Sequence, residues 1–166
     1  IIIPIVVMIL LKNDRILVNH RNYATILSQM TELAKSLPEF SVIREMPGVG
    51  DVLAPRIIAE IGDVRRFHSA SALIAYAGID TPPYESGEFR ASNRKITKRG
   101  SASLRKTGYE IIQALKVVRP QNDNAVYQYL IKKESEGKPL KVAKIAALNK
   151  FLRIYYARVN EIYLNS

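Results

Sequence analysis

The sequence predicts a mainly α-helical protein, and three observations support this fold class. Apolar residues recur at intervals of three and four over most of the chain after residue 20, which is typical of amphipathic helices. Prolines and glycines lie between these periodic segments and divide them into helices of ordinary length. No convincing β-strand pattern follows residue 20. We expect helices near residues 23–37, 51–61, 70–77, 101–118, 123–136 and 140–163.

Composition narrows the class of partner. The 166 residues are enough for one well-buried core, and the apolar content of 48% favours a globular protein. The formal net charge of +10 favours a polyanionic partner, with nucleic acid ahead of an acidic membrane surface. The absence of cysteine excludes disulfides and thiolate zinc sites and fits a reducing cytoplasm. Two histidines are too few for a histidine-built metal site.

The chain begins with an apolar run, IIIPIVVMILL, that is too short for a bilayer, which needs about twenty residues. The run also lacks the basic start and the small-residue cleavage site of a secretory signal. We interpret residues 1–45 as an apolar leader and an amphipathic linker helix, the end of a missing N-terminal part. A buried strand or packed segment is the alternative for the apolar run.

A helix-hairpin-helix motif is expected around the sequence MPGVG. Two glycines allow a tight turn between a short helix and a longer one, and the valine between them plugs the core. Exposed amides at the start of the second helix can hold a DNA phosphate, so Gly48, Val49 and Gly50 are candidate DNA-binding residues. A purely structural turn is the alternative. Pro55 departs from the pattern because it removes a backbone bond from the second helix.

Cap residues place the later helices. Ser69 is expected to cap residues 70–77 at the N-terminus, and Gly78 to end them. Ser101 and Asp123 are the expected starts of the next two helices, and Pro139 fits the first turn of the last. The helix after Ser101 is expected to bury Leu104, Ile111, Ile112, Leu115 and Val118.

The stretch YESGEFRASNRKITKRGSASLRK, from Tyr84 to Lys106, is polar and strongly cationic. Ser86 lies near its start, and Gly87 allows the backbone to bend there. A bendable cationic loop with one hydroxyl, between two helices, is typical of a phosphate site. A solvated loop with a turn serine is the alternative. The candidate DNA-binding cations are Arg90, Arg94, Lys95, Lys98, Arg99 and Arg105.

Four segments occur in one order: MPGVGDVLAPRIIAEIGDVRRF, SALIAYAGID, YESGEFRASNRKITKRGSASLRK and YLIKKESEGKPLKVAKIAALNKFLRIYY. Together they resemble the C-terminal domain of the DEDD transposases of the insertion-sequence one-ten family, relatives of the pilin-gene invertases. The resemblance assigns residues 46–164 to that domain. It implies that Ser86, in Glu85-Ser86-Gly87, is the nucleophile that forms a phosphoserine link to the cut DNA strand.

The resemblance also implies a RuvC-like N-terminal domain with four acidic residues that bind Mg²⁺. The apolar leader of about 20 residues cannot replace that domain, so we expect a truncated transposase with no metal site of its own. The implied partners are DNA and a further copy of the chain in a homo-oligomer. An element-encoded guide RNA is a further partner that the resemblance allows, and no membrane is implied. The implied location is the cytoplasm of a prokaryote, at the nucleoid.

Two other functions stay open from the sequence. One is a non-catalytic helix-hairpin-helix module that binds nucleic acid by its phosphates, in which Ser86 is only a turn residue. The other is an inactive remnant of a mobile element. The catalytic hypothesis predicts that Ser86→Ala abolishes strand transfer, whereas the binding module predicts no change.

Overall fold

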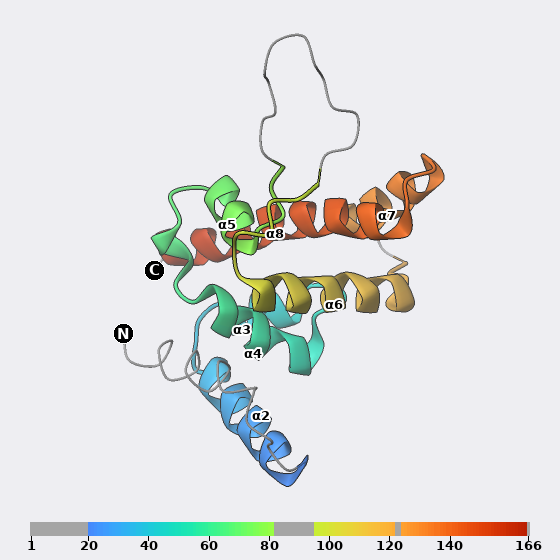
Figure 1. Cartoon of the computed structure of the whole chain (residues 1–166). Helices are drawn as coiled ribbons and strands as arrows, with labels where there is room; N and C mark the ends of the chain where they lie inside the picture. Colours follow the sequence, from blue (N-terminus) through green and yellow to red (C-terminus); the bar gives the residue numbers. More distant parts are fainter. Residues whose placement is uncertain (1–19, 82–94, 122–123, 166) are drawn as a thin grey trace.

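In a computed structural model of the chain, residues 20–81, 95–121 and 124–165 are described (Figure 1). This part of the chain contains helices and no strand. The elements are α2 (His20–Lys35), α3 (Phe40–Arg44), α4 (Gly50–Ile61), the 3-10 helix η1 (Val64–Arg66), α5 (Ala70–Ala77), α6 (Ala102–Val118), α7 (Ala125–Ser135) and α8 (Leu140–Leu164). The predicted mainly α-helical fold is confirmed, and every predicted helix end lies within three residues of the observed one.

The last helix, α8, is the centre of the packing. It contacts α3, η1, α5, α6 and α7, and α6 lies between α8 and α4 (Figure 1). Its buried side chains are Ala143, Ala147, Leu148, Phe151, Leu152, Tyr155 and Val159. They recur at the spacing of one helix face, so burying that face against several helices drives the fold.

Hydrogen-bonding caps fix where the later helices begin. The hydroxyls of Ser69 and Ser101 accept hydrogen bonds from the amides of Ala72 and Leu104, as predicted. The start of α7 differs from the prediction: Asn124 caps it, because its Oδ1 accepts from the amide of Tyr127 at 2.9 Å. Asp123 lies outside the described residues.

One prediction about the buried core is wrong. Val118 was expected on the buried face of α6, but 61% of it is exposed, and the preceding residue Val117 is 81% exposed. Both belong to the last turn of α6, whose last buried residue is Leu115. Periodicity alone identifies a face of a helix, whereas the length of the neighbouring elements decides how much of that face is buried.

Pro55 does not end α4. The ring is buried inside the helix, which continues to Ile61. A proline in a helix lacks the amide that would bond the carbonyl four residues earlier, here that of Asp51. The burial of Ala54, Ile57 and Ile58 around it stabilises the helix despite that missing bond.

The first described helix packs in two places. Met30 of α2 is buried beside Ala59 of α4, with Ile26 and Leu33 packed around them. Ala34 of α2 and Phe40 of α3 both belong to the main core. The proposed division at residue 45 stays a prediction. Within the described residues, no helix combines the length and apolarity needed to cross a bilayer.

A polar contact ties the end of α8 to the start of α3. The Tyr163 hydroxyl donates to Oε2 of the buried Glu39 at 2.7 Å. The guanidinium carbon of Arg65 lies 4.4 Å from the centre of the Tyr163 ring. Burial and the adjacent Glu39 raise the pKa of Tyr163 well above its ordinary value, so the phenol stays protonated as a hydrogen-bond donor.

Candidate nucleic-acid interface

The two chain segments that flank residues 82–94 are fastened to each other. The amides of Thr97 and Lys98 donate to the carbonyls of Asp80 and Gly78, each at 3.0 Å. The Thr97 hydroxyl also donates to Oδ1 of Asp80 at 2.5 Å. We call residues 78–80 together with 97–98 the clasp. Because the clasp fixes both ends, the position at which the intervening segment leaves the helical body is set by described residues.

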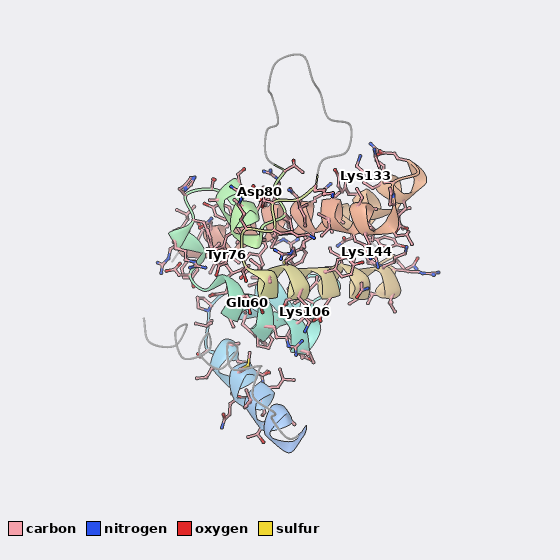
Figure 2. The ribbon with its side chains drawn as sticks, in the orientation of Figure 1. Glu60, Tyr76, Asp80, Lys106, Lys133 and Lys144 are labelled. Carbon is pink, nitrogen blue, oxygen red and sulfur yellow. The ribbon has the colours of Figure 1, made fainter. Side chains whose placement is uncertain are left out.

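A very close backbone approach holds the clasp to α5. A Cβ added to Gly100 would lie 1.9 Å from the carbonyl oxygen of Tyr76, so only glycine fits there. The next residue, Ser101, donates its amide to that carbonyl at 2.6 Å. On the α4 side, Glu60 accepts hydrogen bonds from the hydroxyls of Ser101 and Ser103. Figure 2 labels Asp80 of the clasp, Tyr76 of α5 and Glu60 of α4.

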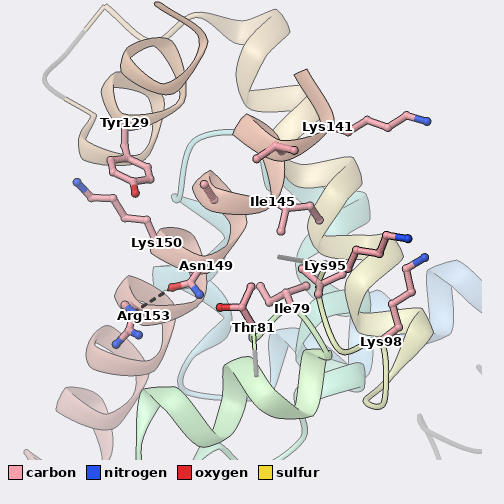
Figure 3. A pocket seen from close by; sticks show the side chains of 13 residues that line it. Ile79, Thr81, Lys95, Lys98, Tyr129, Lys141, Ile145, Asn149, Lys150 and Arg153 are labelled. Carbon is pink, nitrogen blue, oxygen red and sulfur yellow. Dashed lines mark hydrogen bonds between the residues drawn. The ribbon is translucent and has the colours of Figure 1, made fainter. Parts of the chain in front are cut away.

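A groove of about 970 Å³ lies beside the clasp (Figure 3). Residues of the clasp region, of α7 and of α8 line it: Ile79, Thr81, Lys95, Ile96, Lys98, Tyr129, Lys141, Val142, Ile145, Ala146, Asn149, Lys150 and Arg153. Five of these side chains are cations, and none of the thirteen is acidic. We call it the basic groove. Its apolar residues are Ile79, Ile96, Val142, Ile145 and Ala146.

The cations of the basic groove stand on two sides of it. Figure 3 shows Lys95, Lys98 and Lys141 extending on one side, and Lys150 and Arg153 on the other. Two are held in place: Arg153 Nε donates to Oδ1 of Asn149 at 3.0 Å, and Lys150 Nζ lies 5.1 Å from the ring centre of Tyr129. The groove thus has a positively charged edge on either side.

These cations differ from six other described cations, each of which is paired with an acid. Among the described residues, ion pairs join Arg44 to Asp51, Lys116 to Glu134, and other lysines and arginines to acids. No ion pair with a described residue involves any of the five groove cations. Unpaired like charges in a concave surface repel one another and attract a polyanion.

The clasp also constrains the backbone at Lys98. Lys98 has φ +55°, in the left-handed region that residues other than glycine rarely adopt. The hydrogen bond from its amide to Gly78 holds this conformation. Such a backbone costs about 1–2 kcal/mol, which the clasp must offset. The clasp thus determines where the Lys98 ammonium stands on the groove edge.

At the predicted hairpin, the structure has a short helix, a turn and a second helix, namely α3, residues 45–49 and α4. Gly48 has φ +87°, and a Cβ there would lie 2.7–2.8 Å from backbone atoms of Ile111 and Leu115 on α6. Val49 is 3% exposed, so its side chain plugs the core as predicted. The use of this turn for DNA binding stays a prediction.

The electrostatics at the turn are unlike those of the groove. Asp51 lies in the first turn of α4 and is bonded to Arg44, which lowers the pKa of the Asp51 carboxyl. A carboxylate at a helix N-terminus satisfies the positive end of the helix dipole, which is the feature that would attract a phosphate. The turn therefore carries an acid that is paired with an arginine, whereas the groove carries cations that have no ion pair with a described residue.

The structure brings some of the predicted site residues together and separates others. Lys95 and Lys98 line the basic groove, and Arg99 follows them as an exposed residue. Arg105 donates from Nη1 to the carbonyl of Ala77 at 2.9 Å, so it braces the clasp. Gly48, Val49 and Gly50 do not line the groove, and Gly48 packs instead against Ile111 and Leu115 of α6. Ser86, Arg90 and Arg94 lie outside the described residues.

Sequence reasoning missed the contribution of α8 to this surface. Lys141, Ile145, Asn149 and Arg153 recur every four residues and so share one face of the helix. That spacing, with cations at both ends, was the available signal. Val142, which follows Lys141 on the same helix, is 52% exposed and lines the groove.

A magnesium ion needs several oxygen ligands gathered at one place. The described residues contain no group of three or more His, Cys, Asp or Glu side chains placed to hold a metal. Magnesium is held by carboxylate and phosphate oxygens, and the lining of the basic groove has no carboxylate. The groove residues therefore do not fit this ion.

The family model of the IS116/IS110/IS902 transposases matches residues 41–128. The match runs from α3 to α7, includes the clasp and covers more than half of the chain. This chain therefore belongs to that transposase family.

Individual relatives point the same way. The pilin gene-inverting protein of Moraxella bovis is 28% identical over 137 residues, covering 80% of this chain and 42% of that protein. A protein of insertion element IS116 from Streptomyces clavuligerus is 32% identical over 96 residues, 58% of this chain and 23% of its own length. The transposase of IS1111A from Coxiella burnetii is 30% identical over 77 residues, 46% of this chain and 21% of its own. This chain spans about two fifths of the length of the pilin gene-inverting proteins.

Proposed function

We propose that this chain is the part of a family transposase that grips DNA in the basic groove and presents Ser86 to a phosphodiester. The observation that carries the proposal is the position of the groove. Thr81 and Lys95, the described residues on either side of the segment that contains Ser86, both line it. DNA held by the five groove cations would lie at the base of the serine segment.

The chemistry assigned to the chain is a transesterification. The Ser86 hydroxyl oxygen bonds to a DNA phosphorus, and one deoxyribose oxygen leaves and takes up the proton. One phosphoester bond replaces another, so the step needs no external energy source. The cations offset charge on the phosphate oxygens in the transition state. The groove residues do not fit magnesium, so the proposal gives this chain the nucleophile and the cationic environment only.

The relation to the family implies DNA as the partner, and the finer partners are part of the proposal. We place the chain in a homo-oligomeric recombinase, at the nucleoid of a prokaryotic cell, with an element-encoded guide RNA as a further component. The acidic, magnesium-binding domain that the resemblance implies would act on the same DNA.

The first test measures DNA affinity as salt rises, by fluorescence anisotropy with a labelled duplex. We expect a steep salt dependence, with about 0.9 in log–log slope for each phosphate contact. Lys141→Gln with Arg153→Gln should lower the slope by about two such contacts and weaken binding about tenfold at low salt. The matched control, Lys138→Gln with Arg158→Gln, changes the net charge equally at exposed positions outside the groove. Equal losses in the two double variants would contradict the groove as the DNA site.

The second test concerns Ser86. The chain is mixed with the acidic N-terminal domain of a family transposase, magnesium and a DNA junction from the same element. We expect a covalent protein–DNA adduct that maps to Ser86 by peptide sequencing and that disappears in Ser86→Ala but not in Ser92→Ala. An adduct on Tyr84, Ser69 or Ser92 would contradict the assignment. An adduct retained in Ser86→Ala would do the same.

A further inference from the structure

We propose that the basic groove holds an unpaired stretch of DNA, with bases against its apolar floor and phosphates at its cationic edges. The inference rests on the proposed DNA-binding function and specifies the form of DNA that the site takes. The groove combines cations with exposed apolar side chains. A site that bound only the DNA backbone would need the cations but not the apolar surface.

The apolar floor is the first argument. Val142 is 52% exposed, and Ile79, Ile96, Ile145 and Ala146 complete the lining. A fully paired duplex stacks its bases inward and offers charged phosphates on its outside, so it leaves these aliphatic side chains uncovered. An unpaired base brings an apolar face that gains by leaving water. At about 970 Å³ the groove is at the upper end of ordinary ligand sites, large enough for more than one base.

The arrangement of the cations is the second argument. Their placement on both sides of the floor lets a single strand lie along the groove with its phosphates reaching either edge (Figure 3). Four of the five are lysines, whose flexible stems suit phosphates without fixed geometry. Tyr129 adds an aromatic ring to the wall beside Lys150, and aromatic rings are the usual platforms for unpaired bases.

The hydrogen-bonding groups of the lining do not require a ribose hydroxyl. A ribose hydroxyl is recognised chiefly through an acceptor placed for it, and the lining has no carboxylate. Asn149 already accepts a hydrogen bond from Arg153 through Oδ1. Thr81 and Tyr129 are the only hydroxyls among the described lining residues. A strand of deoxyribonucleotides therefore satisfies the groove as well as a strand of ribonucleotides does.

The experiment uses the full chain and three labelled DNAs of equal length. One is fully paired, the second has a short single-stranded gap, and the third has the same gap filled with abasic residues. We expect the gapped DNA to bind at least about fivefold more tightly than the paired DNA. The abasic gap should lose this advantage, because it keeps the phosphates and removes the bases. Equal affinity for gapped and paired DNA would overturn the inference, as would an abasic gap that binds as well as the intact one.

A protein variant locates the effect. Val142→Ser should weaken binding of the gapped DNA more than binding of the paired DNA, and so remove the preference for the gap. Val117→Ser is the matched control, since Val117 is an exposed helix residue outside the groove. Circular dichroism checks that both variants fold. A preference that survives in Val142→Ser would place the bases elsewhere and overturn the assignment.

The outcomes also separate this inference from the proposed function. Binding of paired and gapped DNA with equal, salt-sensitive affinity would retain the proposed function and reject the unpaired strand. Failure to bind any DNA at low salt would reject both. A gap of ribonucleotides that binds more tightly than the deoxyribonucleotide gap would reject DNA as the occupant.

Discussion

The sequence predicted DNA contacts at the glycine turn, residues 48–50, and in the cationic run whose Lys95 and Lys98 line the basic groove. The turn and the groove nevertheless differ in packing and in charge. At the turn, Gly48 lies against the backbone of α6, Val49 is buried, and Asp51 is paired with Arg44. In the groove, five cations stand without an ion pair to any described residue.

The difference shows how a glycine-rich motif and a cationic run can serve separate purposes in one fold. A turn whose side chains are buried and whose charges are paired contributes to stability. A surface with unpaired like charges lacks that stabilisation, because the charges repel one another. A bound polyanion supplies the counter-charge and removes the repulsion. Three substitutions test this contrast.

The largest effect is expected from Gly48→Ala. A Cβ at this position would collide with the backbone of α6, and its φ of +87° is unfavourable for alanine. We expect a loss of about 3 kcal/mol in the free energy of unfolding, measured by urea denaturation. Gly50→Ala is the control, because its φ is +59° but nothing lies within 4 Å of the added Cβ. It should cost only about 1 kcal/mol. Equal losses would show that packing against α6 is not what distinguishes the turn.

An intermediate effect, on binding alone, is expected from Lys98→Gly. Glycine accepts φ +55° without strain, so the free energy of unfolding should change by less than about 1 kcal/mol. The salt dependence of duplex binding should become shallower by about 0.9, the contribution of one phosphate contact. Arg119→Gly removes the same charge from a residue with φ +47° outside the groove. If both variants change DNA binding equally, Lys98 has no special place in the interface.

The smallest effect is expected from Asp51→Asn. If the turn does not contact DNA, removing this carboxylate should raise affinity by less than about twofold, because screening weakens distant charges. Glu161→Gln, at an exposed position of α8, should do the same. A clearly larger rise for Asp51→Asn would place the turn in the DNA interface and support the helix-hairpin-helix prediction.

The same variant has a signature in its pH dependence. The hydrogen bond from Arg44 lowers the pKa of Asp51 in the folded protein. The stabilisation by this pair is therefore present at neutral pH and is lost as the pH falls through the folded-state pKa. Thermal unfolding of the wild type and of Asp51→Asn should differ near neutral pH and converge in acid. A constant difference across that range would mean that the pair does not contribute through its charge.

The sequence by itself determined the helices, because their signals are local. Caps such as Ser69 and Ser101, breakers such as Gly78, and apolar spacing act over one or two turns of chain. The resemblance of four ordered segments also determined the family, which the match over residues 41–128 confirms. Where local signals misled, as at Val118, the missing information was which turns of the helix other elements cover.

Only the tertiary structure decided the composition of the basic groove. Lys95 and Lys98 were visible in the cationic run, but Lys141 and Arg153 come from a helix more than forty residues further along the chain. They meet because the clasp fixes one segment against α5 while α8 packs across α5, α6 and α7. Contacts between segments so far apart depend on how helices pack, and the spacing of residues within one helix carries no record of that packing.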